Sequence, residues 1–334
     1  MPQRLTVARA RKLIFSALTG AGTLPRNASY FSEAILDTEL SGLAGHGFYW
    51  LQYYCEHVQS GKVDGKAKPV VKMLTPVAIR VDARRGFAHP AIEAGFKKLV
   101  PAAKTHGIAA MAVHGSYNAA TLGFHTGVLA RQGLVAFGFT NSTPAIAPVG
   151  GKKPVIGTNP MSFAVPGRAG KIAFLIDQSS SQVPWTAVKI ASVERRPIPL
   201  GWALDADGTP TTDADAGLAG SMEPAGGYKG FGQGLIVEVM CAAMTGSLLG
   251  PQMGSFMDND GRSIGCGQFF MALDPGKFSG GMFDAQVKAL VKSVTSQPGA
   301  RMPNSRREAS IKRLKKEGLP IEAGLLARLE SFAR

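Results

Sequence analysis

The chain has 334 residues, which is enough to bury a large core and more often gives two domains than one. Hydrophobic residues make up 45% and charged residues 18%, a balance that excludes a disordered or fibrous protein. No apolar run reaches the roughly 20 residues that span a bilayer, so we expect no membrane partner, and the basic N-terminus lacks a clean secretory signal.

The net charge of +14 raises the question of nucleic-acid binding. The basic residues are scattered, however, and no recognition motif or aromatic–basic alternation accompanies them. We therefore expect no nucleic-acid partner and attribute the charge to a solvated surface that attracts anionic cofactors and substrates. Cys55, Cys241 and Cys266 are widely separated and odd in number, which indicates free thiols, no metal site and a cytoplasmic location.

The N-terminal part of the chain is predicted to be helical. A first amphipathic helix has Thr6 available as its cap. A second helix opens at Asn27 or Ser29, and an aromatic third helix runs from Phe48 to about Val58. Residues 62–76 contain two prolines and are predicted to connect this layer to another one.

The next elements alternate between strands and helices. Ala78–Asp82 has the pattern of a strand, and His89–His106 that of a helix in which Pro101 is expected to cause a kink. Two short apolar runs, Ile108–Val113 and Val135–Thr140, have the length and composition of further strands.

The segment between those two strands is the most informative part of the sequence. Asn118 or Ser116 can cap a helix that ends at Gly133. A strand that leads through a polar turn into a helix presents free backbone N–H groups, which can hold phosphate or carboxylate. The glycine-rich turns Pro148–Gly151 and Gly157–Pro160 allow the backbone to approach a ligand closely. The arrangement predicts a small-molecule site.

Further elements follow this stretch. Ile172–Ile176 is predicted to be a strand that ends in Asp177, and residues 197–212 are predicted to be loop. Gly226–Gly234 is interpreted as a glycine-rich turn that leads into a helix over Leu235–Leu248. Phe269–Leu273 is a predicted strand.

The C-terminal tail is helical again. Phe283–Val294 carries apolar residues at helical spacing. Ser305 and Glu308 have the spacing of a capping box, which opens a helix closed by Gly318, and Ile321–Phe332 forms a last helix.

Because both ends are helical around a mixed centre, the predicted fold class is α+β. We expect a discontinuous helical domain made of residues 1–72 and 283–334, and a mixed α/β ligand-binding domain over residues 73–282.

Familiar motifs are mostly missing. No G-x-G-x-x-G follows a strand, so a Rossmann fingerprint is absent and the sheet is predicted to be non-Rossmann. Lys229 stands at a helix entrance where it suits a pyrophosphate, although an exposed turn lysine is the plainer interpretation. No paired carboxylates, G-x-S-x-G elbow or H-x-x-x-H spacing support a hydrolase or a metalloenzyme.

His46 differs from the other histidines because it lies between two glycines at a break between helices. The glycines let the chain turn sharply and leave the imidazole accessible, as a general acid or base requires. His114, at a strand end beside the predicted ligand turn, is a weaker candidate, and the remaining histidines are expected to be structural.

An ordered set of motifs resembles the type-2 malate/L-lactate dehydrogenase family over essentially the whole chain. The set consists of Gly45-His-Gly47, Thr140-Asn-Ser142, Pro148–Gly151, Gly157–Pro160, Asp177 with its serine run, and Gly227–Gly232. That family includes ureidoglycolate and sulfolactate dehydrogenases, diketogulonate reductase, and the piperideine- and pyrroline-2-carboxylate reductases. Each motif is weak alone, whereas the ordered set is specific.

The resemblance implies NAD- or NADP-dependent hydride transfer between a nicotinamide and C2 of a small 2-oxo or 2-imino acid, with His46 as the acid/base residue. It places the substrate carboxylate near Thr158, and it aligns Trp50 and Asn118 with further substrate-binding positions. The implied cofactor contacts are Ser116, Tyr117, Asn118, Ala119, Ala120, Thr121, Leu122, Ser142, Ile176, Asp177, Gln178, Lys229, Arg301, Arg306 and Arg307.

Three departures from the family pattern bear on the substrate. Gly45 stands where the family commonly has Ser, Trp50 where it has a carboxylate-binding Arg, and Asn118 where it has a second histidine. Loss of an Arg–carboxylate contact forfeits about 2–3 kcal/mol. Either another cation replaces it, or the substrate is larger and flatter and packs on Trp50 and Tyr117, as a cyclic imino acid would.

Three functional hypotheses therefore stand. The first is a 2-hydroxy/2-oxo acid dehydrogenase, the second a cyclic imino acid reductase, and the third a family member that binds a nucleotide without turnover. The resemblance also implies a homodimer, for which the aromatic helix over residues 48–54 is a candidate interface.

Overall fold

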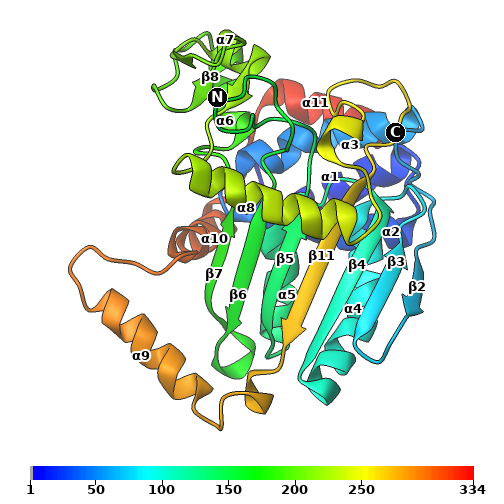
Figure 1. The fold of residues 1–334 in the computed structure, drawn as a ribbon. Coiled ribbons are helices and arrows are strands. Elements are labelled where there is room, and N and C mark those ends of the chain that lie inside the picture. The colour runs from blue at the N-terminus through cyan, green and yellow to red at the C-terminus, as the bar shows by residue number, and fades with distance from the viewer. Residues whose placement is uncertain (1–2) are drawn as a thin grey trace.

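The structure is a computed structural model that describes residues 3–334, and its centre is a seven-stranded sheet (Figure 1). The strand order is β2 (Val70–Met73), β3 (Ala78–Asp82), β4 (Ile108–Ser116), β11 (Cys266–Leu273), β5 (Val135–Thr140), β6 (Met161–Pro166) and β7 (Ile172–Gln178). Only β3 and β4 pair in parallel, and the other neighbours are antiparallel. A sheet of this kind lacks the parallel order of a Rossmann fold, as predicted.

The two faces of the sheet are covered unequally. Helices α4 (Ala88–His106) and α5 (Leu122–Arg131) lie behind the sheet in Figure 1 and share a hydrophobic core with it. Helix α8 (Tyr228–Glu238), continued by a π-helical turn over Val239–Ala243, crosses only the upper part of the other face.

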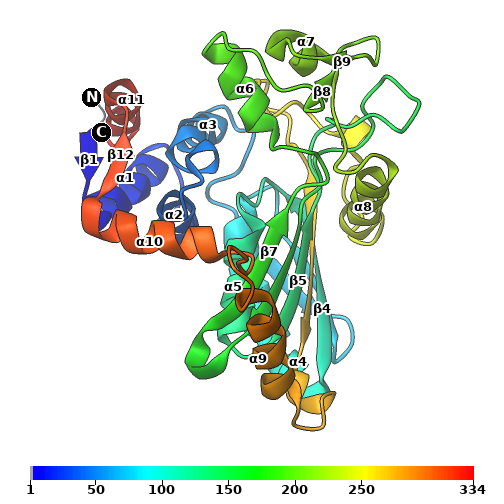
Figure 2. The same cartoon turned by 90° about the vertical axis from the view of Figure 1, so that its left-hand side faces the viewer.

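The chain termini meet in a helical layer beside the sheet (Figure 2). It contains α1 (Val7–Gly20), α2 (Pro25–Leu40), α3 (Phe48–Gln59), α10 (Ser305–Glu317) and α11 (Ala323–Phe332), and one hydrophobic cluster joins residues from both ends of the chain. Strands β1 (Gln3–Leu5) and β12 (Leu319–Ile321) pair antiparallel in the same layer.

Helix α9 (Phe283–Thr295) does not belong to this layer. It has no buried residue and extends away from the body at the lower left of Figure 1. The proposed division at residues 72 and 283 therefore stays a prediction.

A smaller layer lies above the sheet in Figure 1. It contains α6 (Trp185–Val193), α7 (Ala214–Ala219) and a short sheet in the order β10 (Ser221–Met222), β8 (Ala203–Leu204) and β9 (Pro210–Thr211). These elements surround a hydrophobic cluster of their own. Single-turn helices occur at Ala44–His46, Arg168–Gly170, Gly250–Gln252 and Pro275–Lys277.

Several predicted elements are confirmed. Strands β3 and β5 have the predicted bounds, and α1 is capped by Thr6, whose side chain accepts from the N–H of Arg9. Helix α4 runs unbroken through Pro101. No helix within residues 3–334 has both the length and the apolar content needed to cross a bilayer.

Other predictions were wrong at helix starts. Helix α2 begins at Pro25, because proline suits the first turn, and Asn27 instead donates from its buried amide to the carbonyls of Gly65 and Ala67. Helix α10 is preceded by Asn304 in the left-handed conformation, so Ser305 is not its cap.

The second half of the chain holds more regular structure than predicted. The glycine run is not a turn, because α8 already begins at Tyr228. A side chain at Gly230 would meet the backbone of Ala225 at 2.5 Å, so the glycines allow the helix to pack closely. Strands β2 and β6 and helix α6 were missed, and short strands occupy the expected loop.

The joining of the two chain ends generates a first prediction. A Cβ atom at Gly20 of α1 would lie 1.9 Å from the backbone oxygen of Phe332 in α11, whereas one at Gly324 would meet nothing. We expect Gly20→Ala to lower the free energy of unfolding by about 1–3 kcal/mol. Gly324→Ala, also in a helix, should be neutral or stabilising. Urea unfolding of both variants measures this, and equal stability would contradict the close approach of α1 to α11.

Candidate active site

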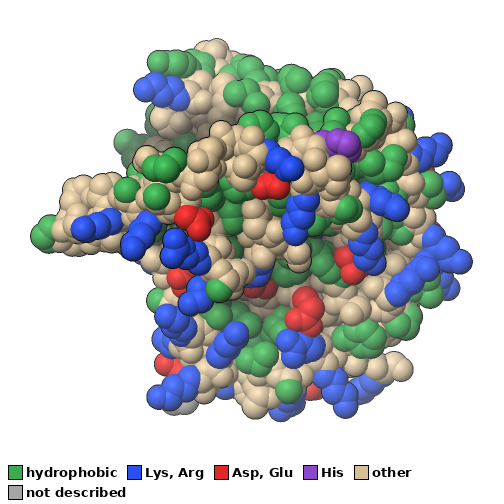
Figure 3. All heavy atoms as spheres, turned by 90° about the horizontal axis from the view of Figure 1, so that it is seen from below, with side chains coloured by type: hydrophobic (Ala, Val, Ile, Leu, Met, Phe, Trp, Pro, Cys, Tyr) green, Lys and Arg blue, Asp and Glu red, His purple; other side chains and the backbone are tan. Residues whose placement is uncertain are grey.

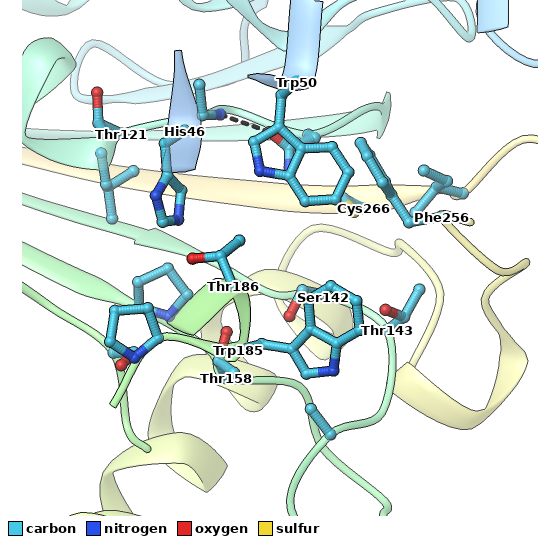
Figure 4. A pocket seen from close by; sticks show the side chains of 18 of the residues that line it. His46, Trp50, Thr121, Ser142, Thr143, Thr158, Trp185, Thr186, Phe256 and Cys266 are labelled. Atoms are coloured by element: carbon cyan, nitrogen blue, oxygen red, sulfur yellow. Dashed lines mark hydrogen bonds between the residues drawn. The ribbon is translucent and has the colours of Figure 1, made fainter. Parts of the chain in front are cut away.

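A cavity of about 630 Å³ opens where the helical layer, the sheet and the smaller layer meet. Its volume is typical of small-molecule sites. Figure 4 shows His46 and Trp50 entering from one side, with Ser142, Thr143 and Thr158 on the opposite side. The wall is therefore assembled from segments that are far apart in the sequence.

His46 ends the single helical turn Ala44–His46, immediately before α3. Its backbone N–H donates to the carbonyl of Leu43 at 2.8 Å, which closes the turn. Gly47 follows because no side chain fits there: a Cβ atom would lie 2.1 Å from a carboxylate oxygen of Glu39. The glycine therefore allows the imidazole and the start of α3 to lie directly against α2.

Glu39 fixes this junction from within α2. Its side chain is 4% exposed and accepts a hydrogen bond from the N–H of Phe48, in the first turn of α3. A carboxylate at this position satisfies a free N–H group and interacts favourably with the helix dipole. Burial nevertheless raises the pKa of Glu39 to about 7, although the hydrogen bond opposes the shift.

An ion pair lies in the same cavity. A guanidinium nitrogen of Arg307 lies 3.0 Å from a carboxylate oxygen of Asp177, at the end of β7. The same oxygen accepts the N–H of Gly123 in the first turn of α5 at 3.0 Å. Removal from water lowers the pKa of His46, the negative Asp177 raises it, and the positive Arg307 lowers it. His46 is therefore mainly neutral at neutral pH.

The turn before α5 forms another part of the wall through Asn118, Ala120, Thr121 and Leu122. The predicted caps were wrong. Asn118 accepts the N–H of Ala120 at 2.7 Å and the hydroxyl of Tyr54 at 3.1 Å. Thr121 occupies the cap position, but its hydroxyl bonds to that of Thr38, so Thr121 does not cap the helix and Asp177 accepts a first-turn N–H instead.

Hydroxyl groups dominate one side of the cavity. Ser142, Thr143, Thr158 and Thr186 line it together with Gln178. Thr186 belongs to α6 and points toward His46 in Figure 4.

Aromatic rings dominate the other end. Trp50 and Phe256 meet edge to face with ring centroids 4.8 Å apart, and Trp185 lies across the cavity from Trp50. The loop that carries Phe256 is held by Lys62, whose fully buried ammonium group contacts the side chain of Asp258 and donates to its carbonyl at 2.8 Å.

Of the residues singled out from the sequence, one group lies together in the wall. This group comprises His46, Trp50, Asn118, Ala120, Thr121, Leu122, Ser142, Thr158, Asp177, Gln178 and Arg307. His114 is not among the lining residues.

The other candidates lie elsewhere. Ser116, Tyr117 and Ala119 are buried beneath the wall, Ile176 lies behind it in β7, and Lys229, Arg301 and Arg306 are exposed. The idea that Tyr117 packs on the substrate was wrong, because its ring is in the core and its hydroxyl bonds to His57. The cofactor contacts predicted for these residues are untested.

Sequence reasoning missed Glu39, Thr186 and Phe256. Glu39 and Thr186 lie within or beside apolar helical segments, and Phe256 lies in a loop without a motif. No local pattern indicated Glu39 as a helix cap, because it lies inside α2 and far in sequence from the first residue of α3. Within residues 3–334 no group of three or more His, Cys, Asp or Glu side chains gathers as a metal site.

Comparison with known proteins gives matches over the full chain. Residues 5–330 match the family model for malate/L-lactate dehydrogenase. The chain is 40% identical to a (2R)-3-sulfolactate dehydrogenase (NADP⁺) of Chromohalobacter salexigens, covering 100% of this chain and 99% of that protein. It is 35% identical to a Δ1-pyrroline-2-carboxylate reductase of Ancylobacter novellus, covering 99% and 98%.

A solved structure has the same fold. The Δ1-piperideine-2-carboxylate reductase of Pseudomonas syringae superposes with a TM-score of 0.93 at 31% identity, covering 99% of each chain.

The buried carboxyl group of Glu39 generates a pH prediction. Its pKa is about 7 in the folded protein and near the ordinary value of 4.5 in the unfolded chain. Between these values the folded state keeps a proton that the unfolded chain releases, so the free energy of unfolding should fall as pH rises from 4.5 to 7. We expect Glu39→Gln to remove this part of the fall. Urea unfolding at pH 5 and pH 8 measures it, with Glu308→Gln, on the exposed face of α10, as control. Identical pH profiles for wild type and Glu39→Gln would contradict the shifted pKa.

Proposed function

Because the chain belongs to the malate/L-lactate dehydrogenase family, we propose that it transfers hydride between a nicotinamide and C2 of a small 2-hydroxy or 2-oxo acid. The observation that carries the proposal is the accessible His46 imidazole beside the Asp177–Arg307 pair, in a cavity of suitable size.

The comparisons bear directly on the class of the reaction. Full-length similarity to named dehydrogenases and reductases makes the chain an NAD(P)-dependent oxidoreductase. The buried free cysteines fit the cytoplasmic location that we propose.

The residues present fit a dinucleotide. The N-terminus of α5 faces the cavity without a cap from Thr121. Asp177 already accepts the N–H of Gly123 there, and the other N–H groups of the first turn favour an anion such as phosphate. Arg307, which is paired with Asp177, adds a guanidinium group, and Ser142 and Gln178 add hydrogen-bonding groups. We propose that these residues and the turn 118–122 hold the cofactor.

The bound nicotinamide would supply or accept the hydride at C2. In the reductive direction, protonated His46 gives its proton to the substrate oxygen, so that the 2-oxo group becomes a hydroxyl group. In the oxidative direction the neutral imidazole takes that proton back. Since the pKa of His46 is lowered, the neutral form dominates at pH 7 and above, and reduction should accelerate as pH falls.

Two alternatives follow from specific observations. The aromatic end of the cavity and the pyrroline- and piperideine-2-carboxylate reductases among the relatives support a cyclic 2-imino acid as substrate. In that case the proton goes to the ring nitrogen. Trp50 and Asn118, which depart from the family pattern, are the reason to retain a nucleotide-binding protein without turnover as the alternative from another class.

We also propose a homodimer, although not through α3. The aromatic residues Phe48, Trp50 and Tyr54 of that helix are buried in their own subunit. The lower part of the sheet face beside α8 has no helix over it in Figure 1. It presents the half-buried rings of Phe137, Phe163 and Phe174, which pack in a row. An apolar face of this kind suits a second copy of the chain, because two-fold pairing makes it self-complementary.

No nucleic-acid partner is proposed. Figure 3 shows Lys and Arg side chains spread over the face seen from below, with acidic side chains between them, and they do not follow one groove. This distribution supports a solvated basic surface rather than a nucleic-acid interface.

The role of His46 is tested by its removal. We expect His46→Ala to reduce kcat for 2-oxo acid reduction by about 10²–10⁴-fold, because the proton donor is lost. Binding of reduced cofactor, followed by its fluorescence, should change little. His106→Ala, at an exposed position at the end of α4, serves as control. Turnover that survives in His46→Ala would reject His46 as the proton donor.

The proposed dimer is tested by introducing charged residues on the sheet face that presents Phe163 and Phe174. Light scattering should give twice the chain mass of 35.1 kDa for the wild type, and a single chain mass for the double variant Phe163→Asp, Phe174→Asp. Lys104→Asp, exposed on α4 behind the sheet, is the control and should remain dimeric. A monomeric wild type would contradict the proposal.

A further inference from the structure

The two ends of the cavity differ in polarity, and this difference bears on the substrate. His46 and the hydroxyl group of Thr186 lie at one end, and Thr158 lies across the cavity from His46. Trp50 and Phe256 form the other end, with Met253 and Ile264 also in the wall. Trp50 lies beside His46 in Figure 4, so a group attached to C2 of a substrate at His46 would meet the indole ring.

Charge is distributed just as unevenly. Among the described residues, the acidic and basic side chains in the wall besides His46 are Asp177 and Arg307, which form an ion pair at 3.0 Å. Lys62 is a buried cation beneath the loop that carries Phe256. Its ammonium group forms ion pairs with Asp258 and Asp260, and Lys62 is not among the residues that line the cavity. The aromatic end therefore has no cation available for an anionic group.

A second negative charge on the substrate would be poorly tolerated at that end. A carboxylate or sulfonate loses its hydration there without gaining a partner, and an unpaired buried ion is strongly disfavoured. A flat uncharged group, in contrast, gains edge-to-face or stacking contacts with the indole and phenyl rings. These rings already meet edge to face at 82°, so the end of the cavity is packed before a ligand enters.

We propose that the substrate carries a single carboxylate and a flat, uncharged ring beside C2, and that Trp50 is the residue that selects against a second anionic group. The inference rests on the proposed hydride transfer at C2 and names its substrate class. In this proposal the hydroxyl groups of Thr158 and Thr186 hold the carboxylate, and the ring lies between Trp50 and Phe256. Oxaloacetate and 3-sulfopyruvate, which carry two negative charges, are excluded as preferred substrates.

The first experiment compares kcat/KM of the full-length enzyme with NADPH and with NADH. The panel contains phenylpyruvate and Δ1-piperideine-2-carboxylate as ring substrates, pyruvate as a small one, and oxaloacetate and 3-sulfopyruvate as dianions. We expect the better ring substrate to exceed both dianions on the order of 100-fold. A dianion that is reduced best would overturn the inference while leaving the proposed hydride transfer intact.

The second experiment changes the selecting residue. Trp50→Arg should lower the ring-to-dianion ratio of kcat/KM at least about 10-fold, because it supplies a cation for the second anion. Trp50→Phe should keep the preference for rings. Tyr49→Arg places the same charge one residue away on α3, outside the wall, and should leave the ratio unchanged. An unchanged ratio in Trp50→Arg would overturn the role of Trp50.

A third experiment measures ligand binding to the wild-type protein, so it requires neither catalytic turnover nor a folded variant. With oxidised cofactor bound, phenyllactate should raise the melting temperature of the wild type at concentrations where malate does not. If no acid in the panel is reduced, the proposed reaction fails, yet this comparison still decides the ligand class. Greater stabilisation by malate would overturn it.

Discussion

The structure depends on one buried contact between a carboxyl group and the start of a helix. Glu39 of α2 accepts the N–H of Phe48, the first residue of α3, and Gly47 leaves just enough room for the carboxyl group. The turn that carries His46 is thereby fixed between two helices whose remaining surfaces are packed in the core. The junction between α2 and α3 therefore sets where the His46 imidazole lies. Most other residues that line the cavity come from the sheet and the smaller layer.

Such a junction could be predicted only in part. Two glycines around a histidine at a helix break form a pattern of neighbouring residues, which can be recognised in a sequence. Patterns of the same local kind correctly predicted β3, β5 and the cap of α1. The partner carboxyl group of Glu39 lies inside an amphipathic helix, where a buried acid leaves no periodic signature. Sequence patterns therefore located His46 and the turn that we propose for phosphate, but not the Glu39 contact that fixes the junction beside His46.

Two further wall residues, Thr186 and Phe256, escaped prediction because tertiary contacts bring them to the cavity. Thr186 and Phe256 reach the cavity from a helix and a loop that lack any motif, and their roles follow only from which segments the sheet brings together. The glycine run before residue 235 shows the opposite error. Glycine usually marks a turn, but here Gly230 lets a helix pack against the backbone of Ala225, so tertiary packing overrides propensity.

The departures from the family pattern are linked in space. Gly45 replaces the common serine, and a Cβ atom at Gly45 would lie 3.2 Å from the hydroxyl oxygen of Thr186. A hydroxyl group therefore occupies that region from α6 instead of from the turn itself. Trp50 removes a cation on the other side of His46, where Phe256 provides an aromatic partner. At both positions the departing residue lies against a neighbouring side chain in the cavity wall, and this packing supports our proposal of a changed substrate over a lost activity.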